Sequence, residues 1–380
     1  MVTDFKNSHQ MYAMDRPMAL EQVENGIILP RIDAGDYPMW GLGGVCDKDN
    51  NFVDLCFYDG GWATHGGKYA WENETFCDKT AVYFGYFFPH WGHFQVDQIG
   101  RLWYFAQAVK EDDVVLAYLG DEDPSGNFLQ FLELAGVRAD QLMRITEPTR
   151  FKKVIVPEFS CKSCVWYSKE YVSIFDTIAQ TVENEGFTCD VPKKIYFSRL
   201  GFNKAKQSEF GEENLAAWLL SNGYEPISPE KLSLRQQVYI WNHAKAIACL
   251  DGSIPLNLNF CRNRHLRLLV MHKTHLEHLN LELTLLMRPC HVTLLDAYYE
   301  PYKKYPTSIG AGPFLLCITE DVQAYSRQHN MTMPFTPDQI KQQRRKGVVQ
   351  LTWQIIDLKG KLRKLMPGKL LAWIRSLRGR

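Results

Sequence analysis

Residues 246–260 read AIACLDGSIPLNLNF, an apolar segment that stops at Asp251-Gly252-Ser253 before a second apolar segment begins. Ala246–Leu250 has the composition of a buried strand, and residues 254–260 are predicted to form a helix. A glycine lets the backbone approach a ligand closely, and the first turn of a helix offers free N–H groups. The stretch therefore contains the parts of a diphosphate-binding turn, although many strand-to-helix turns carry Gly and Ser for structural reasons alone.

The segments on either side of this turn alternate between strand and helix patterns. Strands are predicted at 194–198, near Pro226-Ile227, at Ala246–Leu250 and at 266–271, with helices at Glu212–Leu220 and 233–244. This alternation predicts a parallel sheet covered by helices on both faces. In such a sheet, ligands bind beyond the carboxyl ends of the strands.

The first half of the chain is less regular. Strands are predicted at 82–88, Val114–Leu119 and 154–156, helices at 128–134 and 168–185, and hairpins and loops over 37–62. The length of 380 residues suits two domains. We therefore predict an α/β protein divided into a domain over 1–165, a linker helix over 166–192, a second domain over 193–332 and a tail over 333–380.

Charge is distributed unevenly along the chain. The whole sequence holds 43 basic and 43 acidic residues, but residues 341–380 hold twelve Lys/Arg and a single acid, leaving 31 basic and 42 acidic residues in 1–340. Apolar side chains in the tail recur at helical spacing, at Leu351, Ile355, Leu358, Leu362 and Leu365. The pattern predicts a basic amphipathic tail that binds an anionic membrane surface. The alternative is a terminal helix docked on the acidic body.

Several classes of protein are disfavoured by composition. The ten cysteines show no framework spacing and are predicted to be free thiols, and one CxxC at Cys161–Cys164 is weak support for zinc. No apolar run is long enough to span a membrane, and the N-terminus lacks a signal pattern. We expect a cytoplasmic protein, peripheral on the inner face of the cell membrane, that does not bind nucleic acid, because the body is acidic.

Two groups of polar residues are candidates for chemistry. Arg199 follows the predicted strand 194–198 and can clamp a phosphate, while Glu230 in a loop on the same edge can accept ribose hydroxyls. Ser233 with Gln236 forms a capping-box pattern, which is a structural role.

The second group is His93 and Asp97, which lie four residues apart on one face of a predicted helix and can form a general base with its orienting partner. The structural alternative is that His93 caps or packs, and that Asp97 pairs with Arg101.

These motifs resemble glycosyltransferase family 61 over roughly residues 80–270. In the first half the resemblance lies in Gly92-His93-Phe94 with Asp97. In the second half it lies in Tyr196, Ser198, Arg199, Gly223-Tyr224, Pro229-Glu230, Leu232-Ser233, Gln237, Gly252-Ser253 and Asn257. The chain departs from the family pattern at Asp251, where the family has His, at Gly211-Glu212, and at Gln236.

The resemblance implies a GT-B architecture, in which two Rossmann-like domains face each other across a cleft. It implies inverting, metal-independent transfer of a sugar from a nucleotide sugar, usually a UDP-sugar, to a hydroxyl of a surface polysaccharide or glycolipid, as in bacterial capsule or lipopolysaccharide synthesis, with no cofactor. Asp97 is then the expected base, with His93 as orienter or alternative base. The expected donor-binding residues are Arg199, Glu230, Ser233, Gln237, Gly252, Ser253 and Asn257.

Two other functions remain open at this level. A catalytically inactive, membrane-associated scaffold of polysaccharide assembly is compatible with the departures at Asp251 and Gln236. A nucleotide-sugar epimerase would also place a diphosphate site at the edge of a parallel sheet.

Overall fold

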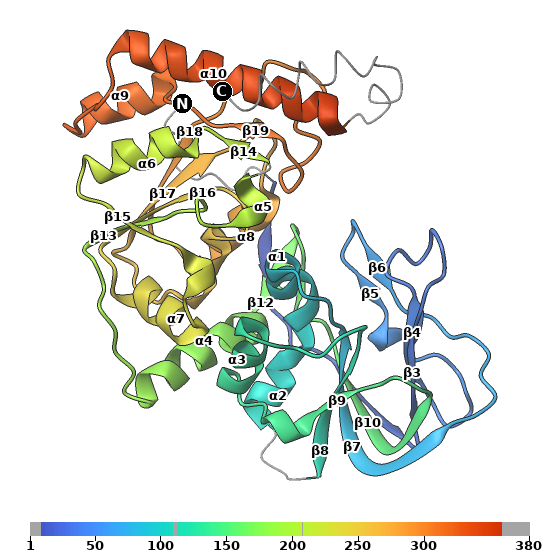
Figure 1. The fold of residues 1–380 in the computed structure, drawn as a ribbon. Coiled ribbons are helices and arrows are strands. Elements are labelled where there is room, and N and C mark those ends of the chain that lie inside the picture. The colour runs from blue at the N-terminus through green and yellow to red at the C-terminus, as the bar shows by residue number, and fades with distance from the viewer. Residues whose placement is uncertain (1–8, 109–112, 207, 359–380) are drawn as a thin grey trace.

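Two β-sheets, one in each half of the chain, organise the computed structural model, which describes residues 9–108, 113–206 and 208–358 (Figure 1). Helices lie between and around the sheets. The predicted α/β class is confirmed.

The C-terminal sheet is fully parallel. Its strands are arranged in the order β15 (Glu225–Ile227), β13 (Lys194–Phe197), β16 (Ala246–Leu250), β17 (Arg267–His272) and β18 (His291–Asp296). The first strand in the sequence is β13, the next one, β15, pairs on one side of it, and β16, β17 and β18 are added in turn on the other side. The strand order therefore reverses between β13 and β16, and such a switch point is where open α/β sheets bind ligands.

Alternate residues of these strands enter separate apolar cores on the two faces. Ile195 and Ile247 pack with α7 (Leu234–His243) and α8 (Leu279–Met287). Tyr196 and Ala248 pack with helices on the other face, namely α6 (Glu212–Leu220) and α9 (Glu320–Gln328). Figure 1 shows α6 and α9 on one side of the sheet and α7 on the other. This double coverage explains why the strands are almost continuously apolar.

Several elements of this half were not predicted, among them α8 and the edge strand β18, which is only half-buried and lacks a strong apolar run. The helix predicted after Asp251-Gly252-Ser253 is confirmed; it is a 3₁₀ helix, η6 (Pro255–Phe260).

The N-terminal sheet is mixed. Strands β10, β7, β8 and β9 are parallel, whereas β2, β3 and β4 are added in antiparallel fashion beyond β10. Their bounds are β2 (Leu20–Glu24), β3 (Ile27–Ile32), β4 (Leu42–Cys46), β7 (Thr75–Tyr86), β8 (Val114–Leu119), β9 (Leu142–Arg144) and β10 (Thr149–Pro157). The parallel part fits the Rossmann-like fold that the resemblance implied, while the antiparallel part was not anticipated.

Three small sheets complete the described strands. They are β1 (Tyr12–Met14) with β12 (Trp166–Ser168) and β11 (Cys161–Lys162), β5 (Tyr58–Asp59) with β6 (Thr64–His65), and β14 (Glu209–Phe210) with β19 (Phe314–Leu315). The α-helices of the N-terminal half and its junction are α1 (Trp91–His93), α2 (Leu102–Ala108), α3 (Asn127–Leu134) and α4 (Lys169–Asn184), and the short α5 (Asn203–Lys206) follows β13 in the C-terminal half. α1 continues through a π-helical turn, Phe94–Gln98, and a 3₁₀ turn, Ile99–Arg101.

Helix α4, predicted as a linker, joins the two halves through a common core. Its buried residues Tyr171 and Phe175 lie in one apolar cluster with Phe131 of α3 and Leu234 and Phe260 of the C-terminal half. Because this cluster contains side chains from both halves, the two sheets are held by packing as well as by chain connectivity.

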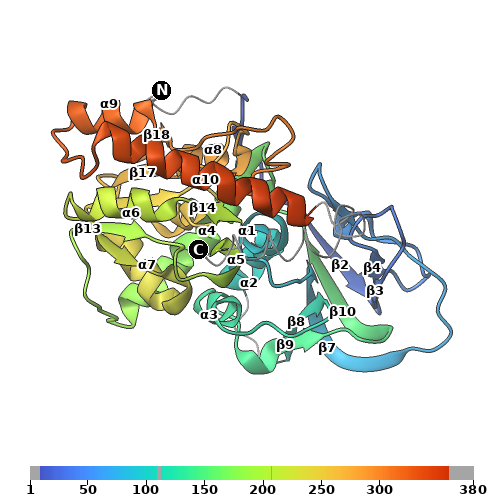
Figure 2. The same ribbon diagram turned by 45° about the horizontal axis from the view of Figure 1, so that its top comes forward.

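The described part of the tail is a long helix, α10 (Pro337–Leu358), that lies along the C-terminal half (Figure 2). It begins well before the predicted apolar stripe, and Leu351 and Ile355 pack against Leu315. The apolar face is thus docked on the body over this stretch, while Lys341 and Arg345 are exposed. The rest of the predicted tail, 359–380, lies outside the described residues.

Two further predictions are tested by the fold. All ten cysteines are free. Among the helices of the described residues, none combines the length and the apolarity that a membrane span requires.

Candidate functional site

His93 and Asp97 form a hydrogen-bonded dyad at the end of α1. His93 Nδ1 lies 2.8 Å from Asp97 Oδ2, and the Asp97 carboxylate is fully buried whereas the His93 side chain is 33% exposed. A carboxylate only accepts hydrogen bonds, so this contact places the proton of neutral His93 on Nδ1. Within the described residues Nε2 of His93 makes no hydrogen bond and is left as the basic atom.

Asp97 is held by three donors. Besides His93, the Tyr58 hydroxyl donates to its Oδ1 at 2.6 Å and Trp62 Nε1 donates at 3.2 Å. Burial and the neighbouring carboxylate raise the pKa of Tyr58 well above its ordinary value, which keeps the phenol protonated as a donor. A carboxylate that is buried and fully hydrogen-bonded suits an orienting role better than direct contact with a substrate.

The structural alternative for this pair is wrong in one respect. Arg101 does not pair with Asp97; its guanidinium donates to the backbone oxygens of Leu55, Cys56 and Pro157. Burial lowers the pKa of Arg101 below its ordinary value. Arg101 therefore anchors the loop before β5 to the end of β10.

A chain of hydrogen bonds connects α1 with the C-terminal half. Trp91 Nε1 donates to Asn257 Oδ1 at 2.8 Å, and Asn257 Nδ2 donates to Gln237 Oε1 at 2.9 Å. Gln237 Nε2 in turn donates to the backbone oxygen of Pro229. Gln237 and Asn257, both expected at the donor site, are thus buried and bonded to protein partners, and their contact with a donor stays a prediction.

The Asp251-Gly252-Ser253 turn follows β16 directly and reaches the start of α1. Gly252 has φ of +130°, a conformation that side chains other than glycine rarely adopt. A Cβ added to Gly92 would lie 3.5 Å from Ser253 Cβ. The turn at the switch point and the helix that carries His93 therefore lie close together, as the predicted site requires.

Arg199 stands at the carboxyl end of β13, but it is already engaged. Its Nε donates to Glu209 Oε2 at 2.8 Å, and Lys273 Nζ donates to the other oxygen of the same buried carboxylate at 2.9 Å. A Cβ added to Gly252 would lie 3.5 Å from Lys273 Nζ. Two cations therefore share one buried carboxylate beside the glycine turn.

Lys273 is the residue that the motif comparison did not identify. It follows β17 immediately, so the argument that selected Arg199, a cation just past the carboxyl end of a parallel strand, applies to it equally. Phe314 covers its ammonium group at 4.4 Å. Burial to 4% exposure makes Lys273 a positioned charge instead of a solvated one.

Asp251, the departure from the family pattern, is enclosed by three donors, of which one is the backbone N–H of the adjacent Gly252, 2.7 Å from Asp251 Oδ1. It accepts from His278 Nδ1 at 2.6 Å and from His272 Nδ1 at 3.0 Å. Burial alone would raise the pKa of Asp251, but His278 and His272 hold it well below its usual range. Burial would likewise lower the pKa of His272, yet the hydrogen bond to Asp251 raises it above its ordinary value. The negative charge is thus compensated locally.

Glu212, the second departure, supports the loop that carries Arg199. Its carboxylate accepts from the Tyr196 hydroxyl, the Ser198 hydroxyl and the Arg199 backbone N–H, at 2.7–3.0 Å. Burial raises its pKa above the ordinary value despite these bonds. Glu212 therefore holds the Tyr196–Arg199 segment in place through these three hydrogen bonds.

The remaining predicted donor residues lie at the carboxyl end of β15. Glu230 is exposed, and a Cβ added to Gly201, in the loop after Arg199, would lie 3.0 Å from its Oε1. Ser233 caps α7, accepting from Gln236 N, and Gln236 Oε1 accepts from Ser233 N. The predicted capping box is confirmed.

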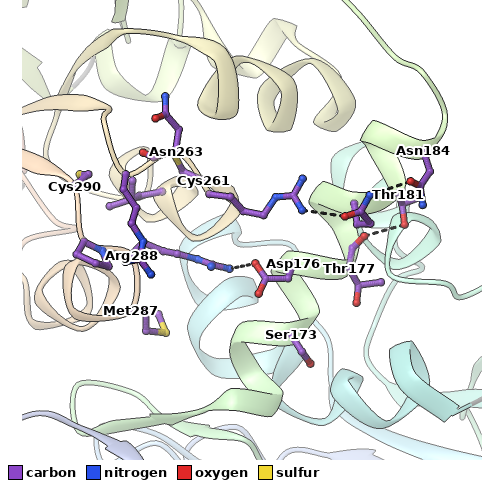
Figure 3. A pocket seen from close by; sticks show the side chains of 15 residues that line it. Ser173, Asp176, Thr177, Thr181, Asn184, Cys261, Asn263, Met287, Arg288 and Cys290 are labelled. Atoms are coloured by element: carbon purple, nitrogen blue, oxygen red, sulfur yellow. Dashed lines mark hydrogen bonds and ion pairs between the residues drawn. The ribbon is translucent and has the colours of Figure 1, made fainter.

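The more spacious cavities lie at the opposite edge of the C-terminal sheet. One of about 680 Å³ lies between α4 and the residues before β17 and β18; in Figure 3 Arg288 reaches across it to Asp176, at 2.7 Å. Smaller cavities of about 230 Å³ lie at the carboxyl ends, one beside Arg199 and Glu209 and one beside His272 and His278. We place the site at the carboxyl ends, because the dyad and the glycine turn lie there and Arg288, which spans the 680 Å³ cavity, is paired with Asp176.

In the part of the chain that the structure describes, no cluster of three or more His, Cys, Asp or Glu side chains has the arrangement of a metal site. That transfer needs no metal stays a prediction, because this observation concerns protein side chains and not the reaction.

The His93–Asp97 dyad thus lies near the glycine turn at the switch point of the C-terminal sheet, which is where open α/β sheets bind ligands. The family model Glycosyltransferase 61 matches residues 91–267, which include His93, Asp97, Arg199 and Gly252. Over this segment the chain is similar to glycosyltransferase family 61, which indicates a glycosyltransferase with a sugar donor and a glycan acceptor. A comparison with curated proteins finds no match.

Proposed function

We propose that the protein transfers a sugar from a nucleotide sugar, of the UDP type, to an acceptor hydroxyl with inversion at the anomeric carbon. The observation that carries this proposal is the contact between Gly92, one residue before His93, and Ser253 of the glycine turn. It brings a base and an anion-binding turn together from two sheets whose carboxyl edges face each other. This arrangement supports a GT-B architecture, with domains close to 1–165 and 193–332.

His93 is the base in this mechanism, and Asp97 is its positioning partner. The acceptor O–H gives its proton to His93 Nε2 as the oxygen attacks the anomeric carbon from the face opposite the diphosphate. Asp97, fixed by Tyr58 and Trp62, keeps the proton of neutral His93 on Nδ1 and stabilises the imidazolium that forms. The sequence-based assignment of Asp97 as base is reversed here, because its carboxylate is buried behind the imidazole.

The C-terminal half stabilises the leaving diphosphate. The bond between the anomeric carbon and the diphosphate oxygen breaks as the new bond forms, and negative charge grows on the leaving group. Lys273, Arg199 and the backbone N–H group of Ser253 are placed to bind it, and Glu230 is placed to bind ribose. Because these cations supply the compensating charge, we propose that transfer needs no bound metal and no other cofactor.

The acceptor, in this proposal, is a glycan or glycolipid of a cell-surface polysaccharide, and the enzyme works on the cytoplasmic face of the membrane. Lys341, Arg344, Arg345 and Lys346 form an exposed basic face on α10, which supports attraction to anionic lipid. Sedimentation with vesicles of phosphatidylglycerol, and with neutral phosphatidylcholine vesicles as control, tests this. Equal partitioning into both would contradict an anionic membrane partner.

The function is tested with a panel of nucleotide sugars, by thermal stabilisation and by slow hydrolysis, on the wild type, Arg199→Ala and His93→Ala. One donor should raise the melting temperature of the wild type and of His93→Ala but not of Arg199→Ala, and only the wild type should hydrolyse it at a substantial rate. Binding without hydrolysis or transfer to any glycan would favour the inactive scaffold. Conversion of the donor to another nucleotide sugar without an acceptor would favour the epimerase.

A further inference from the structure

The imidazole of His93 is surrounded by aromatic rings from separate segments. Trp62 stacks on it with ring centroids 4.6 Å apart and planes inclined by 27°, and His90, Phe88 and Trp40 approach at 4.4, 5.7 and 6.3 Å. Phe88 and Trp40 are half-buried, whereas Trp62 is 44% exposed. A large indole is thus presented to solvent directly beside the proposed base.

Trp62 is exposed without being loose. Its Nε1 donates to Asp97, and Trp40 meets its ring edge-on at 5.1 Å. The two loops are joined where Trp40 N donates to the backbone oxygen of Thr64 at 2.9 Å, and the turn before Trp62 is tied by Gly61 N to Asp59 Oδ1 at 2.8 Å. An indole that is fixed in advance and still exposed loses little conformational entropy when a ligand stacks on it.

The charges around this surface are paired. Asp59 forms an ion pair with Lys162 at 2.8 Å, and the carboxylate of Asp97 is enclosed by its three donors. Nothing among these groups offers an unpaired charge to a ligand, so the surface suits a neutral ring with an apolar face. Indole rings combine a large apolar surface with a polar edge, which matches a sugar ring whose C–H face is apolar and whose rim carries hydroxyls.

We propose that Trp62, backed by Trp40, is the acceptor platform and that it stacks on a pyranose ring, so that the acceptor is a saccharide. The positioning follows from the base. A hydroxyl within about 2.6–3.2 Å of His93 Nε2 belongs to a ring that lies close to the imidazole, and the 44% exposed indole of Trp62 is an aromatic surface directly beside that imidazole. The placement at a base rests on the proposed function, whereas saccharide binding by Trp62 does not.

Saturation-transfer NMR with a panel of neutral tetrasaccharides, built from glucose, galactose, mannose or N-acetylglucosamine, tests this on the full-length protein. The variants are Trp62→Leu, which removes the ring, and Trp62→Phe, which keeps a smaller ring. Trp71→Leu is the matched control, because Trp71 is a partly exposed tryptophan of the same half that packs elsewhere, against Ile27 and Leu29. Thermal unfolding, and binding of UDP to each variant, report on folding and on the donor side.

At least one saccharide should bind the wild type and Trp71→Leu equally, roughly tenfold more weakly to Trp62→Leu, and with intermediate affinity to Trp62→Phe, as loss of one stacking contact predicts. Unchanged binding to a folded Trp62→Leu, or no saccharide binding to the wild type, overturns the proposal. Submicellar dodecylphosphocholine and a Ser/Thr-rich peptide are tested in the same way. If Trp62→Leu weakens the binding of one of these and of no saccharide, the proposal is overturned and the acceptor is a lipid or a protein. If UDP binds while saccharides do not, the acceptor platform is wrong and the proposed transferase function is retained. If saccharides bind through Trp62 while UDP does not, the platform is retained and the proposed donor site is wrong.

Discussion

The two sides of the candidate site are built on opposite principles. On the N-terminal side, His93 and Asp97 form a pair embedded in aromatic rings, on an irregular helix whose support comes from the loops that carry Tyr58 and Trp62. On the C-terminal side, charged residues stand at the ends of regular parallel strands and share buried carboxylates. The first arrangement suits moving a proton beside a sugar ring, and the second suits holding an anion. The comparison teaches that one candidate site can combine a histidine held by loops, which we propose as the base, with a cluster of charges held by a regular sheet.

The largest effect is expected from the base. His93→Ala should lower the transfer rate about 10²–10⁴-fold, the usual contribution of general base catalysis, while UDP binding is unchanged. Steady-state transfer and calorimetric titration with UDP measure the two. Asp97→Asn should also lower the rate but keep some activity, since the base itself remains. A fully active His93→Ala together with an inactive Asp97→Asn would restore Asp97 as the base.

The aromatic side should also be the more sensitive to acid. His65 is buried behind Trp40, with Nδ1 2.9 Å from the backbone oxygen of Gly41, and burial lowers its pKa to about 4. Because the folded pKa lies below the unfolded value of 6.5, the stabilising contribution is present above pH 6.5 and is lost as pH falls toward 4.

The expected loss in the free energy of unfolding is about 3 kcal/mol, at roughly 1.4 kcal/mol for each unit of pKa difference. Urea unfolding from pH 7 to 4 measures it, and His65→Gln should flatten the dependence. Parallel curves for the wild type and His65→Gln would show that His65 is not the acid-sensitive group.

The charge cluster can be tested one cation at a time. Lys273→Met should weaken UDP binding roughly ten- to a hundredfold, the loss expected for a hydrogen bond to a charged group. Lys194→Met is the control, because Lys194 is the first residue of β13 and so lies at the amino ends of the strands, away from the candidate site. Equal affinity of both variants for UDP would remove Lys273 from the donor site and leave its bond to Glu209 as its only role.

The smallest effect separates a cap from a ligand. Ser233→Ala should reduce the free energy of unfolding by about 1 kcal/mol through loss of the α7 cap. UDP affinity should be unchanged if capping is its whole role. A clear loss of UDP affinity, measured below the unfolding temperature, would show that Ser233 also contacts the donor.

Local pattern was sufficient for much of the C-terminal half. β16, α6 and the Ser233–Gln236 capping box follow from runs and spacings within a few residues, because a buried parallel strand and a capped helix are specified by their own side chains. The antiparallel strands β2–β4 and the edge strand β18 could not be recognised, because their signals are weak and depend on which strand they pair with.

What the sequence by itself determined is the inventory and the spacing: the four-residue separation of His93 and Asp97, the glycine turn after β16, and the family resemblance. Tertiary structure alone decided the surroundings of these residues. In the folded protein Asp97 is buried and accepts hydrogen bonds from Tyr58 and Trp62. Asp251 accepts hydrogen bonds from His272 and His278, and Lys273 lies beside Gly252. The physical reason is that proton affinity and charge depend on burial and on partners far apart in the chain, which no local pattern records.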